Sequence, residues 1–159
     1  MKKTIITDVE RCTGCKLCML ACSFRHERRF SLMNSRIQVR IDKVTNINVP
    51  FICEQCGEHT CVDACPIGAI YYDNDLTIFR VDPNRCTGCG SCVQACPYNG
   101  IFLNMDGKAS KCDLCEGDPT CVKYCILPQA IRYGEINTKN VMEKSKGIFL
   151  KLRNGEEAK

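Results

Sequence analysis

The sequence lacks tryptophan, and aromatic residues make up only 7% of it. Its apolar fraction of 45% includes sixteen cysteines, so conventional core-forming residues amount to roughly 35%, against the usual ~45 to 50%. A chain of 159 residues suffices for one ordinary domain or two very small ones. Because large apolar side chains are scarce, we expect a group bound by the cysteines to hold the fold together.

Long apolar runs are also missing. No stretch approaches the ~18 to 20 apolar residues of a membrane-spanning helix. After Lys2 and Lys3 the chain reaches Asp8 and Cys12 before the apolar region of a secretory signal could fit. We therefore expect a soluble cytoplasmic protein with reduced thiols, which argues against a disulfide scaffold. The chain also shows no phosphate-binding loop, nucleotide fingerprint or nucleophile arrangement, so we expect it to be non-catalytic.

The cysteines fall into four groups of four. Groups one to four are Cys12, Cys15, Cys18 and Cys22; Cys53, Cys56, Cys61 and Cys65; Cys86, Cys89, Cys92 and Cys96; and Cys112, Cys115, Cys121 and Cys125. Groups one and three share the spacing C-x2-C-x2-C-x3-C and the local sequence Arg-Cys-Thr-Gly-Cys. Groups two and four have a looser middle. The chain is therefore interpreted as a doubled unit.

Short strands and helices fit between these groups. Apolar alternation predicts a strand over 36–44 that returns over 47–52. Further hairpins are predicted over 70–81, around Asp73-Asn74-Asp75, and over 101–111, around Asp106-Gly107. We expect a short helix after the third cysteine of each group.

The spacing of the cysteines favours iron-sulfur cubes over other uses. Thiolates at i, i+3 and i+6, beside Gly14 or Gly88, can wrap a loop around one side of a cube so that each sulfur meets a different iron. The C-x2-C-x2-C-x3-C-P run is the bacterial ferredoxin signature, and Cys96 and Cys65 are followed by its proline. Four [4Fe-4S] clusters are therefore predicted. Zinc, which is more often held by separated C-x2-C pairs, and plain buried cysteines remain as alternatives.

The gaps between groups predict which cysteines share a cluster. Groups two and three are separated by a single hairpin, so they form one module, and groups one and four pair around it. In two-cluster ferredoxins the fourth cysteine binds the neighbouring cluster. The predicted ligand sets are Cys12, Cys15, Cys18 with Cys125; Cys53, Cys56, Cys61 with Cys96; Cys86, Cys89, Cys92 with Cys65; and Cys112, Cys115, Cys121 with Cys22. The predicted fold is α+β, with two ferredoxin-like 2[4Fe-4S] modules related by a pseudo-twofold. The inner module, 50–105, is inserted in an outer one made of 1–49 and 106–135, and 136–159 forms a C-terminal tail.

The sixteen cysteines resemble the four-cluster polyferredoxin family, over about Thr4 to Tyr133. Around Ala21-Cys22-Ser23-Phe24-Arg25-His26-Glu27 the chain is similar to small subunits of tungsten aldehyde oxidoreductases and related benzoyl-CoA reductase complexes. The resemblance implies an electron-transfer subunit that relays single electrons to or from the tungsten- or molybdenum-containing catalytic subunit of an oxidoreductase. A flavoprotein or ferredoxin is expected as a second redox partner. The alternatives are a subunit of a hydrogenase or carbon monoxide dehydrogenase, a free polyferredoxin, and a zinc-binding interaction module.

The net charge of +4 does not predict a nucleic-acid partner. An oxidised cube with four thiolates carries about −2, so four of them bring the folded protein to about −4. Electrons would hop between clusters one at a time. Backbone N–H groups of the Thr13-Gly14 and Thr87-Gly88 loops are expected to donate to cluster sulfur.

A few other residues invite functional interpretation. We expect His26 to form hydrogen bonds or lie at the surface, although it could approach a cluster, and His59 to be an exposed loop residue. Asp73 and Asp75 belong to a turn and need no catalytic role. The basic run Arg25, Arg28 and Arg29 is either a solvated face or a docking site for an acidic catalytic subunit. Tyrosines near fourth cysteines are expected to pack over clusters: Tyr71, Tyr72 and Tyr98.

The tail combines basic residues with an apolar patch at 148–152. Such a patch with a basic rim indicates either contact with another subunit or self-association, or folding back over its own hairpin.

Overall fold

The computed structural model describes residues 3–43 and 45–135 of the 159-residue chain. The tail, for which the sequence predicts a subunit contact, lies outside these residues. The helices of the described part are α1 (Leu17–Glu27), α2 (Thr60–Asp63), α3 (Ser91–Ala95) and α4 (Thr120–Lys123), with a 3-10 turn η1 (Leu114–Gly117). Its strands form antiparallel pairs: β1 (Lys3–Thr7) with β8 (Ile131–Glu135), β2 (Ile37–Ile41) with β3 (Asn48–Ile52), β4 (Ile70–Asp73) with β5 (Ile78–Val81), and β6 (Ile101–Leu103) with β7 (Ala109–Lys111).

The third cysteine of each group is the second residue of a short helix. These cysteines are Cys18 in α1, Cys61 in α2, Cys92 in α3 and Cys121 in α4. The prediction of a helix at each group is confirmed, although each helix begins at the residue before the third cysteine, two residues earlier than predicted. Left-handed residues, with φ of 62°, 49° and 78°, directly precede the first three helices. The chain therefore reverses sharply between the second and third cysteine of those groups.

The three hairpins predicted between the cysteine groups are confirmed. Strands β2 and β3 pair from Ile37 with Ile52 to Ile41 with Asn48, and the β4–β5 and β6–β7 hairpins occupy the predicted ranges. The β1–β8 pair, in which Lys3 lies opposite Glu135, was not predicted from the sequence. These strands come from opposite ends of the described chain, so no local turn signal marks their pairing.

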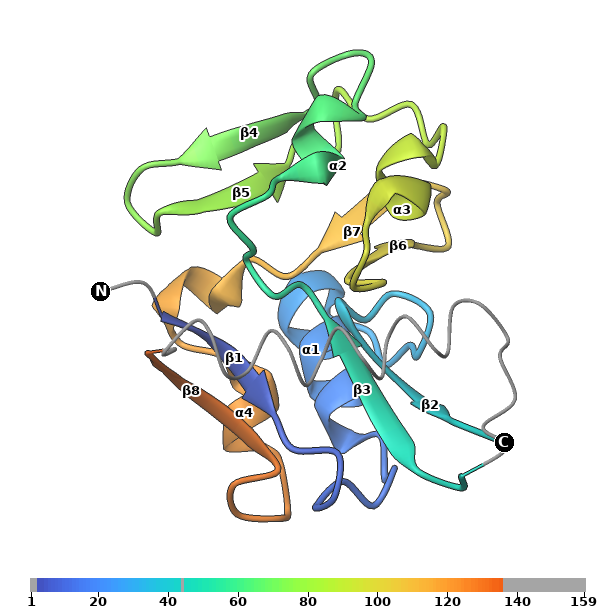
Figure 1. Cartoon of the computed structure of the whole chain (residues 1–159), viewed down its shortest axis with the longest axis vertical. Coiled ribbons are helices and arrows are strands. Elements are labelled where there is room, and N and C mark those ends of the chain that lie inside the picture. The colour runs from blue at the N-terminus through green and yellow to red at the C-terminus, as the bar shows by residue number, and fades with distance from the viewer. Residues whose placement is uncertain (1–2, 44, 136–159) are drawn as a thin grey trace.

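The elements gather into two halves, which Figure 1 shows one above the other. One half contains β4, β5, α2, α3, β6 and β7, and the other contains β1, β8, α1, α4, β2 and β3. Helix α1 packs against α4, and α2 packs against α3. Two clusters of buried side chains, each centred on one half, combine cysteines with large apolar residues, although Ile78 of β5 belongs to the cluster centred on the other half. The described chain therefore forms a small mixed α/β fold with two cores.

Strand β3 connects the two cores. Val49 and Phe51 belong to one buried cluster, whereas Ile52 belongs to the other. The boundary expected between residues 49 and 50 falls inside β3, and the one expected between 105 and 106 falls in the β6–β7 turn. Each expected boundary therefore falls within a hairpin whose two strands lie in the same half of the molecule.

No helix among residues 3–43 and 45–135 combines the length and the hydropathy needed to cross a bilayer.

The two Thr-Gly loops have similar geometry. Gly14 and Gly88 have φ of 71° and 78°, a region that favours glycine. A Cβ atom on Gly88 would lie 2.2 Å from the carbonyl oxygen of Gly107 in the β6–β7 turn. One on Gly14 would lie 2.2 Å from Oδ1 of Asn48, at the start of β3. Each loop thus lies directly against a hairpin, with no room for a side chain.

The variants Gly88→Ala and Gly90→Ala separate close packing from backbone strain. Both glycines have φ of 78°, but no atom lies within 4 Å of a Cβ built on Gly90. We expect Gly90→Ala to cost only the left-handed strain, about 1 to 2 kcal/mol. Gly88→Ala should lower the melting temperature more, measured anaerobically by circular dichroism, because the β6–β7 turn must also move. Equal losses for the two variants would contradict this packing.

Candidate metal centres

Three pockets of the structure are each lined by four cysteines. In every pocket, three cysteines come from one group and the fourth comes from another. The sets are Cys12, Cys15, Cys18 with Cys125; Cys53, Cys56, Cys61 with Cys96; and Cys86, Cys89, Cys92 with Cys65. The structure thus brings together the same combinations that the gaps between the groups predict.

The remaining four cysteines also lie near one another. Burial raises the pKa of the Cys121 thiol, and the charges of Cys22 and Cys115 raise it further. The pKa of Cys112 is raised first by burial and then by Cys121, with a smaller effect of Cys22. Because α1 carries Cys22 and α4 carries Cys121, the packing of α1 against α4 assembles this fourth set.

Backbone N–H groups point at several cysteine sulfurs. Three fourth-position cysteines accept such bonds: Cys22 from Arg36 N at 3.3 Å, Cys65 from Ala69 N at 3.2 Å, and Cys96 from Gly100 N at 3.3 Å. Three first-position cysteines accept them as well: Cys53, Cys86 and Cys112. Hydrogen bonds to a thiolate stabilise its negative charge, so these sulfurs are prepared to act as anionic ligands.

The buried thiols need a cation in order to ionise. Burial, and secondarily the charges of neighbouring cysteines, raise the pKa of Cys18 to about 12. Burial raises the pKa of Cys61 to about 12 as well, although Lys111 opposes the shift. A metal ligand must be a thiolate, so metal binding at these sites has to displace protons.

The residues present fit [4Fe-4S] clusters. Each set supplies four sulfurs, one for every iron of a cube. The walls of the Cys86 set include the apolar side chains of Ile70, Val81 and Ala109. A single zinc ion would also accept four thiolates, so the sulfur count alone does not distinguish the two metals.

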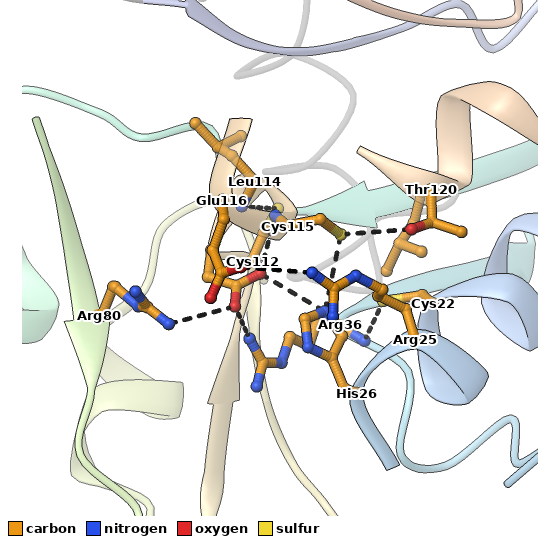
Figure 2. A network of polar contacts seen from close by, with 12 residues as sticks. Cys22, Arg25, His26, Arg36, Arg80, Cys112, Leu114, Cys115, Glu116 and Thr120 are labelled. Atoms are coloured by element: carbon orange, nitrogen blue, oxygen red, sulfur yellow. Dashed lines mark hydrogen bonds and ion pairs between the residues drawn. The ribbon is translucent and has the colours of Figure 1, made fainter. Parts of the chain in front are cut away.

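A polar network surrounds the fourth set. Figure 2 shows Arg36, Arg80 and His26 converging on the loop of Cys112 and Cys115. Within it, the carboxylate of Asp113 pairs with Arg36, lies 3.6 Å from Nη2 of Arg80 and lies 3.4 Å from Nε2 of His26.

Asp113 stays ionised in this network. Burial raises its pKa, but the charge of Arg36 and the backbone N–H of Cys115 outweigh burial and hold the pKa below its usual value. Because Arg80 belongs to β5 and Arg36 directly precedes β2, this buried carboxylate links the two halves of the molecule.

His26 is half-buried and lies beside the cysteines of the fourth set. Its Nε2 is 3.7 Å from the sulfur of Cys115. Burial, followed by the charge of Arg36, lowers the pKa of His26 to about 4, so the ring is neutral at physiological pH. The ligand atoms of His26, Asp113 and Cys115 lie within 4.8 Å of one another. The guanidinium groups of Arg36 and Arg80 already neutralise the carboxylate of Asp113. His26 and Asp113 therefore lie beside the fourth cysteine set and do not form a separate cation site with Cys115.

The prediction that His59 is an exposed loop residue is wrong. His59 is half-buried, lines the pocket of the Cys53 set, and its ring centroid is 4.4 Å from that of Phe79. The left-handed turn before α2 directs the ring inward. Of the basic run, Arg25 forms an ion pair with Glu116 at 3.3 Å.

The tyrosines differ from one another. Tyr98 is fully buried and lines the pocket of the Cys53 set, as expected for packing over a cluster. Tyr71 and Tyr72 lie on β4, are 43% and 47% exposed and line none of the three cysteine pockets; the centroid of the Tyr72 ring instead lies 5.1 Å from that of Phe79. Asp73 accepts bonds from the backbone N–H groups of Asp75 and Leu76, so it shapes the turn as predicted.

Three buried polar residues next to the cysteines were not predicted from the sequence. Lys111 and Gln55 are each 6% exposed, and Asp113 is 5% exposed. Lys111 and Asp113 directly flank Cys112. A charge beside a buried ligand must find a partner, so this adjacency is the signal that could have identified them.

Comparison with known proteins identifies the class of these sites. A family model described as a 4Fe-4S dicluster domain matches residues 44–136, and one described as a 4Fe-4S binding domain matches residues 9–25. The cysteine sets therefore belong to an iron-sulfur protein.

Individual relatives agree with this class. The chain is 40% identical, over 76% of its own length and 70% of the relative's, to the polyferredoxin-like subunit of an aliphatic sulfonate oxidoreductase from Pyrococcus furiosus. It is 31% identical, over 86% of its length and 78% of the relative's, to the thiosulfate reductase electron transfer subunit of Salmonella typhi. Two longer relatives are matched over only 28% and 21% of their lengths.

A solved structure, the active-site complex BamBC of benzoyl coenzyme A reductase as isolated, aligns with 95% of this chain and 89% of its own at 24% identity and a TM-score of 0.48. The sequence matches show that the chain belongs to the [4Fe-4S] polyferredoxin family. Its cofactors are [4Fe-4S] clusters, which disposes of the zinc alternative.

Asp113 and Asp118 provide a matched test of the polar network. Asp113→Ala removes a buried carboxylate and leaves Arg36 and Arg80 without it. We expect the protein to lose about 3 kcal/mol of stability. Asp118→Ala breaks only the exposed pair with Lys123 and should cost under about 1 kcal/mol. Anaerobic thermal unfolding of the two variants measures the difference. An Asp113→Ala protein as stable as Asp118→Ala would show that the network does not hold the two halves together.

Proposed function

We propose that this chain is the electron-transfer subunit of an oxidoreductase complex and carries four [4Fe-4S] clusters. When bound, the clusters supply reversible one-electron storage. The chain's own residues fix their positions, exclude water and set their charge environment. The observation that carries the proposal is the gathering of all sixteen cysteines into four sets of four. Relatives described as a polyferredoxin-like subunit and as an electron transfer subunit support it.

The proposed ligand sets exchange their fourth cysteine. Cys125 would complete the set of group one and Cys22 that of group four, while Cys96 and Cys65 would do the same for groups two and three. Support comes from the three pockets and from the mutual effects of the cysteine charges. The exchange fits an inner ferredoxin-like module inserted in an outer one, related by a pseudo-twofold. The packing of α1 on α4 and of α2 on α3, and the two separate cores, are consistent with this arrangement.

We also propose that the four sites form a row. Cys18 contributes to the raised pKa of Cys121, which is consistent with neighbouring group-one and group-four sites. Cys53 does the same for Cys112, which is consistent with neighbouring group-four and group-two sites. The proposed order is therefore the sites of groups one, four, two and three.

The two ends of the proposed row are the more accessible. Cys15 of group one and Cys89 of group three are exposed, whereas Cys112 and Cys115 of group four are buried. Redox partners would therefore exchange electrons at the group-one and group-three ends. We propose a tungsten- or molybdenum-containing catalytic subunit as one of these partners.

Anaerobic purification from the native cell tests this function. About sixteen iron and sixteen acid-labile sulfide per chain are expected, together with a co-purifying subunit that contains tungsten or molybdenum. Nickel in the co-purified complex would replace this partner by a hydrogenase or carbon monoxide dehydrogenase. A chain that purifies alone would indicate a free polyferredoxin. A preparation without iron would refute the proposal.

Cysteine variants test the exchange of ligands. In Cys125→Ala the group-one cluster should be impaired, so anaerobic alkylation and mass spectrometry should find Cys12, Cys15 and Cys18 labelled. The matched variant Cys22→Ala should instead expose the first three cysteines of group four. Labelling of group four in Cys125→Ala, with group one protected, would contradict the pairing.

A further inference from the structure

A lysine lies buried between two of the cysteine sets. Lys111 ends β7 and is 6% exposed, which is rare for an ammonium group. Its Nζ donates to the carbonyl oxygen of Phe79 at 2.9 Å and to Oε1 of Gln55 at 3.1 Å. Both partner atoms are acceptors, so this position suits a protonated, positively charged amine.

Gln55 connects the lysine to both sets. Its Nε2 donates to the carbonyl oxygen of Cys112 at 2.9 Å, while its Oε1 accepts from Lys111. Its own backbone N–H donates to the sulfur of Cys53 at 3.4 Å. Gln55 is buried and has φ of 51°, a conformation that costs free energy in a residue other than glycine. The loop thus accepts strain in order to place this amide between Cys53 and Cys112.

The charge of Lys111 acts mainly on the group-two set. Lys111 lines the pocket of that set together with Cys53 and Cys61, and it directly precedes Cys112 of group four. Reduction of a cluster adds one negative charge, and a fixed positive charge in a low-dielectric interior stabilises the reduced form more than the oxidised form.

We propose that Lys111 raises the reduction potential of the group-two cluster, and to a smaller extent that of the group-four cluster, through its buried positive charge. This inference rests on the proposed ligand sets. No bond forms or breaks at the lysine: one electron from an external reductant enters the cluster while the ammonium keeps its proton. In the proposed row, Lys111 lies where the inner and outer modules meet, so it would favour electrons in the middle of the row.

Redox titration followed by electron paramagnetic resonance tests this proposal. Lys111→Met and Lys111→Gln remove the charge, so one midpoint potential should fall. At a fixed applied potential, the ratio of reduced to oxidised group-two cluster should drop about tenfold, a shift of about 59 mV for a one-electron couple. The control Lys123→Met removes an exposed lysine two residues from Cys121 and should leave all potentials unchanged. Glu54, whose carboxyl group is ionisable, lines the pocket of the Cys53 set. All redox titrations are therefore carried out at the same pH, so that the charge of Glu54 does not differ between proteins.

A second readout starts from the wild-type protein. In protein labelled with 15N-lysine, pulsed electron paramagnetic resonance should detect a lysine nitrogen coupled to a reduced cluster, and Lys111→Arg should lose this coupling while keeping the wild-type potential.

The outcomes separate this inference from the proposed function. Absence of iron-sulfur signals in the wild-type chain would refute the function itself. Wild-type clusters without a coupled lysine nitrogen would overturn the role of Lys111 alone. Unchanged potentials in an assembled neutral variant, or equal shifts in Lys123→Met, would overturn it too.

Discussion

The fold depends on bonds between sulfur and metal that join distant parts of the chain. Thiols such as Cys18 and Cys61, whose pKa burial raises to about 12, cannot carry negative charge in the interior without a bound cation. The sets also combine residues far apart in sequence, as Cys12 and Cys125 show. Metal binding to sites that exist only in the folded chain contributes directly to folding free energy. This contribution compensates for a core with few large apolar side chains.

Elements with a local signal could be predicted from the sequence. The β2–β3, β4–β5 and β6–β7 hairpins follow from alternation and turn residues, and the helices follow from the position of the third cysteine. The β1–β8 pair has no such signal. Its five-residue strands are brought together by tertiary structure, with Ile5 in β1 and Ile131 in β8 both buried in one core.

The candidate sites were predictable to a similar extent. The gaps between the groups predicted the four sets of cysteines, because in two-cluster ferredoxins the fourth cysteine binds the neighbouring cluster. The polar residues around them could not be assigned, since their partners come from other elements: Arg80 of β5 reaches Asp113, and Phe79 of the same strand accepts from Lys111. His59 was wrongly predicted to be exposed. It adopts the left-handed conformation that precedes α2, and without a glycine at this position the sequence gives no signal of that conformation.

Charge distinguishes the middle of the molecule from its ends. Near the junction of the two halves, buried Lys111 and the Arg36–Asp113–Arg80 group place cations beside Cys53, Cys112 and Cys115. At the ends, Cys15 and Cys89 are exposed to water, which screens charge. Because the potential of an iron-sulfur cluster depends on local charge and solvent exposure, we expect these differences to separate the potentials of the sites.

The most direct measurement is a crystal structure of the anaerobically purified chain, phased on the anomalous scattering of iron. The account predicts four separate cubes of iron in a row, each bound by three cysteines of one group and one of another, with Cys125 on the cube of group one. Four cubes that each bind only the cysteines of their own group, or single metal ions in their place, would contradict it.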